Sequence, residues 1–173
     1  VNMSGTAVAM PFADKVASIV QAWYLGSETG NALADVLTGK VNPSGKLPFS
    51  FPVRLEDNGA HALNAYHKDS LTVEYKESIF VGYRWLDKHD IKPLFAFGHG
   101  LSYTTFEYGP ATIRKNGNRF KLSLDVTNTG SLEGKEIVQL YIGDDESTLV
   151  RPIKELKGFK KIAILPGQTQ KGT

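Results

Sequence analysis

The first part of the chain carries the pattern of a strand followed by a helix. Val1–Met10 alternates small and apolar residues, as in a strand that leads into a loop. Apolar residues then run almost continuously over Ser18–Tyr24, which favours a strand covered on both faces. After a polar break, apolar residues recur at helical spacing and predict a helix over Asn31–Thr38, and Gly39 suits the left-handed residue that ends it. A strand, a tight polar loop and a helix make one α/β unit.

The middle of the chain carries turn and loop signals. Val41–Pro48 contains prolines and a glycine, which exclude a helix and favour a turn with an extended exit. Arg54–Lys76 is polar, weakly periodic and too long for a plain connector, so we predict a surface loop there. Ile79–Trp85 is compact and aromatic. Pro93–Tyr103 is rich in glycine and aromatic residues, and we predict a rigid segment without a helix.

From about residue 104 the pattern changes to alternating apolar and polar positions. A hairpin-type turn at 115–118 precedes a strand with one buried face over 120–126. Further strands are predicted over 137–142 and 156–164. Short strands with turn signals at this spacing favour a β-sandwich. The predicted fold is therefore α/β followed by all-β.

Composition and charge narrow the class of protein. The 173 residues include 20 basic and 18 acidic ones, and this balance does not point to a nucleic-acid or anionic-membrane partner. No apolar run approaches the ~18 residues of a membrane-spanning helix. Cysteine is absent, which excludes disulfides and thiolate sites without fixing the compartment. The chain opens at Val1 without a Met start and closes just after a turn, so we expect part of a larger protein.

Three short motifs do not meet the spacing that their chemistry requires. Gly39 and Gly45-Lys46 are one residue too far apart for a phosphate loop, and Leu47 stands where a magnesium-binding hydroxyl belongs. Gly98-His99-Gly100 lacks the third glycine of a dinucleotide site. Ser4 lacks the first glycine of a nucleophile elbow. We therefore predict no cofactor.

Histidines and acidic residues are the remaining candidates for chemistry. The four histidines do not form a compact set of metal ligands; they are His61, His67, His89 and His99. The best pair is His61 and His67, and we expect both to be solvated and to bind no metal. Five acidic residues leave paired carboxylates for glycoside hydrolysis possible: Glu28, Asp35, Glu74, Glu77 and Asp87. Glu28 is expected to interact with a helix start, and Glu77 to pair with Arg84 or Lys76. A lysine cluster, expected on the solvated face of a strand, comprises Lys154, Lys157, Lys160 and Lys161.

Several long segments, in order, resemble family 3 glycoside hydrolases. The segments that resemble the late part of these enzymes are Ala22–Gly39, Val41–Pro48, Glu77–Trp85 and Pro93–Phe106. Those that resemble the family's fibronectin type III-like module are Val126–Gly130, Glu136–Tyr141 and Glu155–Phe159.

The resemblance implies two incomplete domains. Residues 1–103 would be the C-terminal part of the α/β sandwich domain, and residues 104–173 a partial fibronectin type III-like domain with about four of its usual seven strands. The complete enzyme would be a retaining β-glycosidase, most simply a β-glucosidase acting on terminal non-reducing β-D-glycosyl residues. No residue here matches the family's nucleophilic Asp or acid/base Glu, so no catalytic residue is assigned. Its partners would be the rest of the enzyme and a β-glucoside, with no nucleic acid and no membrane, in a periplasmic or secreted setting.

An alternative hypothesis is a stand-alone carbohydrate- or protein-binding module. It would use exposed aromatic side chains such as Tyr66, Tyr83 and Trp85. If the chain instead belongs to a complete family 3 enzyme, we expect Arg54–Lys76 to lie near the active-site mouth or a domain junction, because long loops usually carry function.

Overall fold

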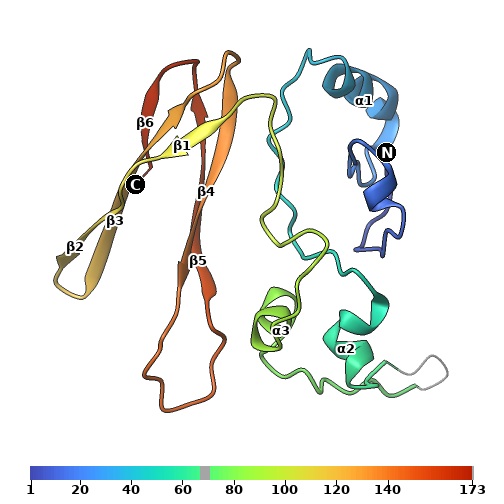
Figure 1. The fold of residues 1–173 in the computed structure, drawn as a ribbon. Helices are drawn as coiled ribbons and strands as arrows, with labels where there is room; N and C mark the ends of the chain where they lie inside the picture. Colours follow the sequence, from blue (N-terminus) through green and yellow to red (C-terminus); the bar gives the residue numbers. More distant parts are fainter. Residues whose placement is uncertain (67–70, 173) are drawn as a thin grey trace. The chain divides into compact units, whose positions relative to one another are not determined.

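A computed structural model describes residues 1–66 and 71–172 (Figure 1). Contacts divide the chain into two compact units, and each is assembled from three separate segments. The first unit comprises Val1–Thr29, Leu47–His99 and Tyr141–Leu156. The second comprises Gly30–Lys46, Gly100–Leu140 and the chain from Lys157 onwards.

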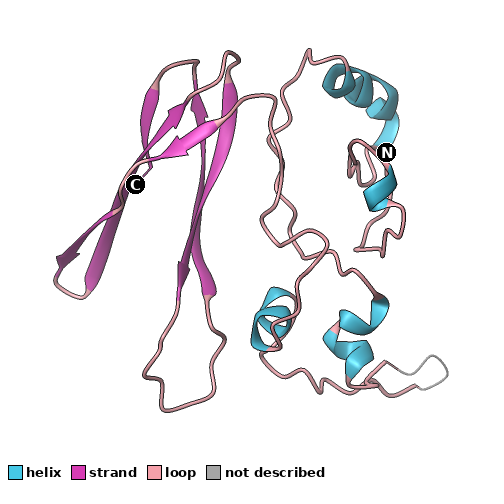
Figure 2. Ribbon diagram, in the orientation of Figure 1, coloured by secondary structure: helices cyan, strands magenta, loops and turns pink. Residues whose placement is uncertain are grey.

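The strands form two sheets (Figure 2). In the first sheet, β3 is central and pairs antiparallel with three short strands. The second sheet is the pair β4–β5. The strands are β1 (Phe106–Tyr108), β2 (Thr112–Asn116), β3 (Arg119–Asn128), β4 (Gly134–Ile142), β5 (Glu155–Ile164) and β6 (Thr169–Gly172).

β1 and β2 follow one edge of β3 and are separated by a bulge. The pair Tyr108–Val126 belongs to β1 and the pair Thr112–Ser123 to β2. Between these pairs, 109–111 lie opposite only two residues of β3, so this edge carries one extra residue. The segment contains a proline, which cannot donate to the ladder, and a bulge tolerates it.

Apolar side chains from both sheets form the core of the β part. Val126 and Ile164 are completely buried, and Ile162 is nearly so. Phe106, Leu124 and Val138 pack against this cluster. The predicted β-sandwich is therefore present, because alternate residues of facing sheets meet in one layer.

The predicted hairpin is confirmed, but the strand count was wrong. A two-residue loop joins β2 to β3, and Gly117 has a φ of 59°, as the first central residue of such a turn requires. The described residues contain six strands rather than about four. The unforeseen strands β1 and β6 span three and four residues, too short to show an alternating pattern.

The helix predicted over 31–38 is confirmed as α1 (Thr29–Leu37). A 3₁₀ turn over Gly26–Glu28 leads into it, and Gly39 has the predicted left-handed φ of 77°. The strands predicted over 1–10 and 18–24 are wrong, because the two segments share only one parallel bridge, Asn2–Gln21. An apolar run becomes a strand only where it finds a partner ladder, and here the ladder is a single bridge.

The first unit has its own small core beside α3 (Tyr83–Lys88). Phe80, Trp85 and Leu86 are buried there, with Leu63 and Ile91 packed against them. The helix begins after Gly82, whose φ of 63° turns the chain into it. The first unit also contains the 3₁₀ turns Ala13–Lys15 and Leu55–Asp57 and the helix α2 (Gly59–Ala62).

The surface loop predicted over 54–76 contains short helical elements that were not predicted, the turn Leu55–Asp57 and α2. Asp57 is buried, accepts a hydrogen bond from the Arg54 backbone N–H at 2.9 Å and pairs with the Arg54 guanidinium at 3.2 Å. Asn58 caps α2 by accepting from the backbone N–H of Ala60 at 3.3 Å. Within the described ranges, all helices are too short or too polar to cross a membrane.

Candidate functional site

Asn42 joins three loops of the second unit. Its side-chain amide donates to the carbonyl of Glu133 at 2.9 Å. Its side-chain oxygen accepts from the hydroxyl of Ser102 at 2.9 Å and from the backbone N–H of Tyr103 at 2.8 Å. The turn predicted over 41–48 is thus fixed to a segment some sixty residues later by a side chain that uses both ends of its amide.

Lys46 and Glu136 form an ion pair that is largely removed from solvent. The ammonium group lies 3.2 Å from a Glu136 carboxylate oxygen, and the two side chains are 17% and 9% exposed. Lys46 also donates to the carbonyl of Gly100 at 2.7 Å. Glu136 accepts from the backbone N–H of Ile137 at 2.9 Å. Lys46 is therefore committed to a protein carboxylate, in agreement with the expectation that it is not a phosphate-loop lysine.

Tyr108 completes this polar network. The pKa of its phenol is raised from 10.0 to about 12, mainly by burial and then by the negative charge of Glu136 and a hydrogen bond to that carboxylate. The phenol therefore stays neutral at ordinary pH and can donate to Glu136. The network stabilises the fold but presents no free acid for catalysis.

Asn128 is the most deeply buried polar side chain of the β part, with no exposed surface. Its oxygen accepts from the Thr104 hydroxyl at 2.7 Å and from the Gly130 backbone N–H at 3.1 Å. Its amide donates to the carbonyls of Leu132 and Ile164 at 2.8 and 2.9 Å. Each of these four hydrogen bonds satisfies a polar group near the core.

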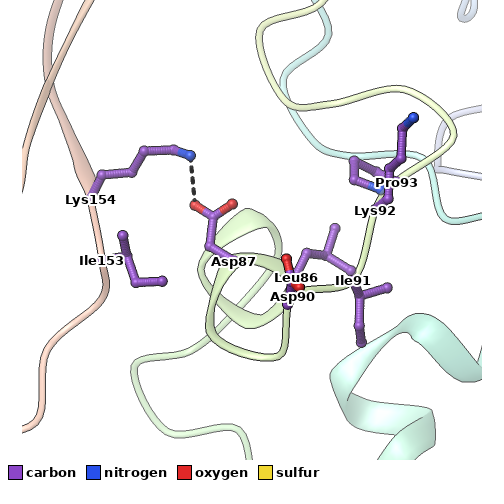
Figure 3. A pocket seen from close by; sticks show the side chains of 8 residues that line it. All are labelled: Leu86, Asp87, Asp90, Ile91, Lys92, Pro93, Ile153 and Lys154. Atoms are coloured by element: carbon purple, nitrogen blue, oxygen red, sulfur yellow. Dashed lines mark ion pairs between the residues drawn. The ribbon is translucent and has the colours of Figure 1, made fainter.

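The first unit contains a surface cavity of about 480 Å³ beside α3 (Figure 3). At this cavity, the Lys154 ammonium lies 3.0 Å from an Asp87 carboxylate oxygen. The two groups form an ion pair, but their orientation does not make a hydrogen bond. All four lysines of the predicted cluster are exposed, but Lys154 stands one residue before β5, whereas Lys157, Lys160 and Lys161 lie on that strand. The lining residues are Leu86, Asp87, Asp90, Ile91, Lys92, Pro93, Ile153 and Lys154.

Further contacts tie α3 to the start of β5 and the end of β4. Arg84 pairs with Glu155 at 3.1 Å. The Tyr83 hydroxyl accepts a hydrogen bond from the backbone N–H of Leu156 at 2.9 Å. Burial raises the pKa of Tyr141, and its neighbours Tyr83 and Asp87 raise it further. Since Asp87 is already paired, the cavity does not present the two available carboxylates that glycoside hydrolysis needs.

The other predicted acidic candidates are dispersed. Asp35 pairs with Lys40 at 2.9 Å, and Glu74 pairs with Lys76 at 2.7 Å. Glu28 immediately precedes α1, as its expected role at the helix start requires. The expected partners of Glu77 pair elsewhere, Arg84 with Glu155 and Lys76 with Glu74. Glu77 instead lies against Gly59.

The histidines that the structure describes each contact an aromatic ring. His89 lies 4.0 Å from Trp85, His99 stacks 5.5 Å from Phe95, and His61 lies 5.6 Å from Tyr66, between ring centres. His67 lies outside the described residues. Across 1–66 and 71–172, ligating side chains do not gather in a group that could hold a metal ion.

Two of the three aromatic residues proposed for a binding platform are unavailable. Trp85 is only 7% exposed. The ring of Tyr83 stacks on Phe97 at 5.0 Å and meets Tyr141 edge-on at 6.0 Å. Tyr66 is 58% exposed. The structure therefore weakens the hypothesis of an aromatic binding module.

Comparison with protein families identifies the chain. Residues 1–103 match the family described as the glycosyl hydrolase family 3 C-terminal domain. The chain belongs to this family. Residues 136–173 match the fibronectin type III-like domain. The family 3 resemblance of the separate sequence motifs is thus confirmed.

The family 3 relatives include β-glucosidases from bacteria and fungi. The β-glucosidase BoGH3A of Bacteroides ovatus is 55% identical over 97% of this chain, which spans 23% of that relative. The thermostable β-glucosidase B of Acetivibrio thermocellus is 50% identical over 97% of this chain and 22% of its own length. The chain thus spans less than a quarter of these curated relatives.

Solved family 3 structures agree with the fold. A Kluyveromyces marxianus β-glucosidase in complex with glucose has a TM-score of 0.93 and 45% sequence identity to this chain. The match covers 99% of this chain and 20% of the K. marxianus chain. β-Glucosidase 3B from Thermotoga neapolitana, also in complex with glucose, has a TM-score of 0.91 and 39% sequence identity to this chain. The match covers 96% of this chain and 24% of the T. neapolitana chain.

Sequence reasoning missed the polar networks of this family 3 chain. The sequence pattern predicts a turn at Asn42 and Lys46, and it marks Glu136 and Asn128 only as members of motifs. One available signal was a polar residue at a strand position where the alternating pattern places the core, as at Asn128.

Proposed function

We propose that this chain is the C-terminal structural part of a retaining β-glucosidase. The complete enzyme would hydrolyse terminal non-reducing β-D-glucosyl residues by a double displacement that needs two carboxylates. The chain itself carries neither of them, and it has no cofactor or metal role. The observation that carries the proposal is the match of nearly the whole chain to β-glucosidases of which it spans about a fifth.

We further propose that residues 1–103 belong to the α/β sandwich domain and residues 104–173 to the fibronectin type III-like domain. The family ranges 1–103 and 136–173 support this division. The partners would be the rest of the same enzyme and a β-glucoside.

The ion pairs and hydrogen bonds give this chain a structural rather than a chemical role. Lys46 and Glu136 neutralise each other, as do Lys154 and Asp87. Because charged groups that are already paired are poor acids or bases for a substrate, these side chains hold loops in place instead. The two catalytic carboxylates would come from other parts of the enzyme.

The test compares the purified chain with the complete protein on a nitrophenyl β-glucoside. We expect no turnover by the chain alone and turnover by the complete protein. Proton NMR of the first product of the complete protein should show the β-anomer of glucose, as retention requires. Turnover by the pure chain would refute the assignment of both carboxylates elsewhere, and an α-anomer would refute the retaining mechanism.

A further inference from the structure

The β2–β3 hairpin carries the net positive charge of the chain. Residues 112–121 hold four basic residues and no acidic one, which leaves 16 basic against 18 acidic residues in the rest. In Figure 1 the hairpin extends beyond the ends of β1 and β6. Every residue from 111 to 121 is exposed, so both faces of the hairpin are open to solvent within the second unit.

Strand register places three of these cations on one face. Arg114 lies directly opposite Lys121, and Arg119 lies opposite Asn116 in the next pair but one toward the turn. Since alternate residues of a strand point to opposite faces, these side chains project from the same face, which we call the cationic face (Arg114, Arg119, Lys121). The fourth cation, Lys115, lies on the other face, 5.9 Å from the centre of the Phe120 ring.

On the same side of β3, the cationic face is followed by one acidic residue, Asp125, which forms no ion pair with it within the described residues. None of its three side chains takes part in an ion pair there. Like charges directly opposite each other in a β-ladder are destabilising, so the pair Arg114–Lys121 costs stability unless an anion lies over it. Guanidinium groups bind carboxylates through paired hydrogen bonds, which makes a carboxylate the matching ligand.

Among the paired residues of the β2–β3 hairpin, the remaining side chains of this face are polar and uncharged. They are Thr112, Asn116 and Ser123, which can exchange hydrogen bonds with hydroxyl groups. The face carries no aromatic ring, whereas single-stranded nucleic acids are bound by stacking on aromatic platforms. Alternating cations and hydroxyl- or amide-bearing groups instead fit a sugar chain that carries both carboxylates and hydroxyls.

We propose that the cationic face of the β2–β3 hairpin binds a carboxylate-bearing polysaccharide, a polymer of uronic acids. The choice of a sugar polymer rests in part on the proposed role in a β-glucosidase. Such a surface would hold the protein at an anionic polysaccharide matrix. Binding is ionic, so added salt should weaken it.

The experiment measures binding of the complete protein to polygalacturonate by isothermal titration calorimetry at low salt and with about 0.5 M NaCl. The test variant is Arg114→Gln/Arg119→Gln/Lys121→Gln. The matched control, Lys15→Gln/Lys92→Gln/Lys135→Gln, removes the same charge from three other exposed positions. Phe120→Thr, on the opposite face, controls for hairpin integrity, and circular dichroism checks that each variant is folded.

We expect the complete protein to bind polygalacturonate and the test variant to bind it about tenfold more weakly. This factor is the combined effect on affinity of losing three exposed charge contacts. Both controls should bind as the parent does, and a neutral β-glucan should not bind. Equal binding by the test variant and the parent, or no binding by the parent, would overturn the proposal. So would tighter binding of duplex DNA than of polygalacturonate. None of these outcomes depends on turnover of a β-glucoside, so the two proposals fail independently.

Discussion

Replacing Asn128 with leucine tests whether a satisfied buried amide holds the β part together. The substitution keeps the approximate size of the side chain but removes four hydrogen bonds of 2.7–3.1 Å. At about 1 kcal/mol net each, their loss costs about 4 kcal/mol, and the added apolar burial of leucine offsets about 1–2 kcal/mol. We therefore expect Asn128→Leu to lower the free energy of unfolding by about 2–3 kcal/mol.

The assay is guanidinium unfolding followed by circular dichroism, with the change taken from the midpoint at constant slope. Thr127→Val is the matched control, because it removes the neighbouring hydrogen bond to Thr169, which is exposed. It should cost less than about 1 kcal/mol. Asn128→Asp keeps the acceptor but sets a carboxylate against the carbonyls of Leu132 and Ile164. Its penalty should shrink as the pH falls and the carboxylate is protonated. A loss for Asn128→Leu no larger than that for Thr127→Val would refute the reasoning.

Three further changes probe the polar network and the close backbone approach beside it. Lys46→Met should lower the free energy of unfolding by about 3 kcal/mol in thermal unfolding, because it leaves the buried carboxylate of Glu136 without its cation. Adding Glu136→Leu should restore part of that loss, and no recovery in the double variant would argue against the ion pair. Gly100→Ala would place a methyl group against the backbone carbonyl of Gly45 and should lower the melting temperature by several degrees. Gly158→Ala has open space around it and should not, and equal effects of the two substitutions would contradict the close backbone approach at Gly100. The folded pKa of Tyr108 is raised from 10.0 to about 12, so its contribution to stability is complete below pH 10 and is lost as the pH rises toward 12. Tyr108→Phe should therefore remove one phenol that titrates near pH 12 from an absorbance titration at 295 nm; an unchanged titration near pH 12 would contradict the assignment.

The elements that could be predicted from sequence are those stabilised by local patterns. The α1 helix has regular apolar spacing and a glycine stop, and β3 alternates over ten residues behind a glycine turn. The strand expected over 18–24 failed because a continuous apolar run specifies burial but not a partner. The short helical elements within 54–76 were not predicted for a different reason, since they are fixed by Asp57 and the Asn58 cap rather than by periodicity.

The candidate site was predictable mainly as a set of exclusions. Spacing alone argued against Lys46 as a phosphate-binding residue, and the structure gives the reason, an ion pair with a residue ninety positions later. Long-range polar pairs of this kind leave no periodic signal in one sequence. The placement of Arg54–Lys76 near an active-site mouth or a domain junction stays a prediction, and residues 67–70 of that segment lie outside the described residues.

The interleaving of the two contact units limits how this chain can be recombined. The segment Tyr141–Leu156 belongs to the first unit although it lies well beyond residue 103, and it supplies the partners of Tyr83, Arg84 and Asp87. A chimera that joins residues 1–103 of this chain to the β part of a distant relative would therefore keep the ion pairs of Arg84 and Asp87 only where that relative carries matching charges, whereas the hydrogen bond to Tyr83 needs only a backbone N–H. Evolutionary exchange at that boundary needs compensating changes in α3, so the two parts are expected to be inherited together.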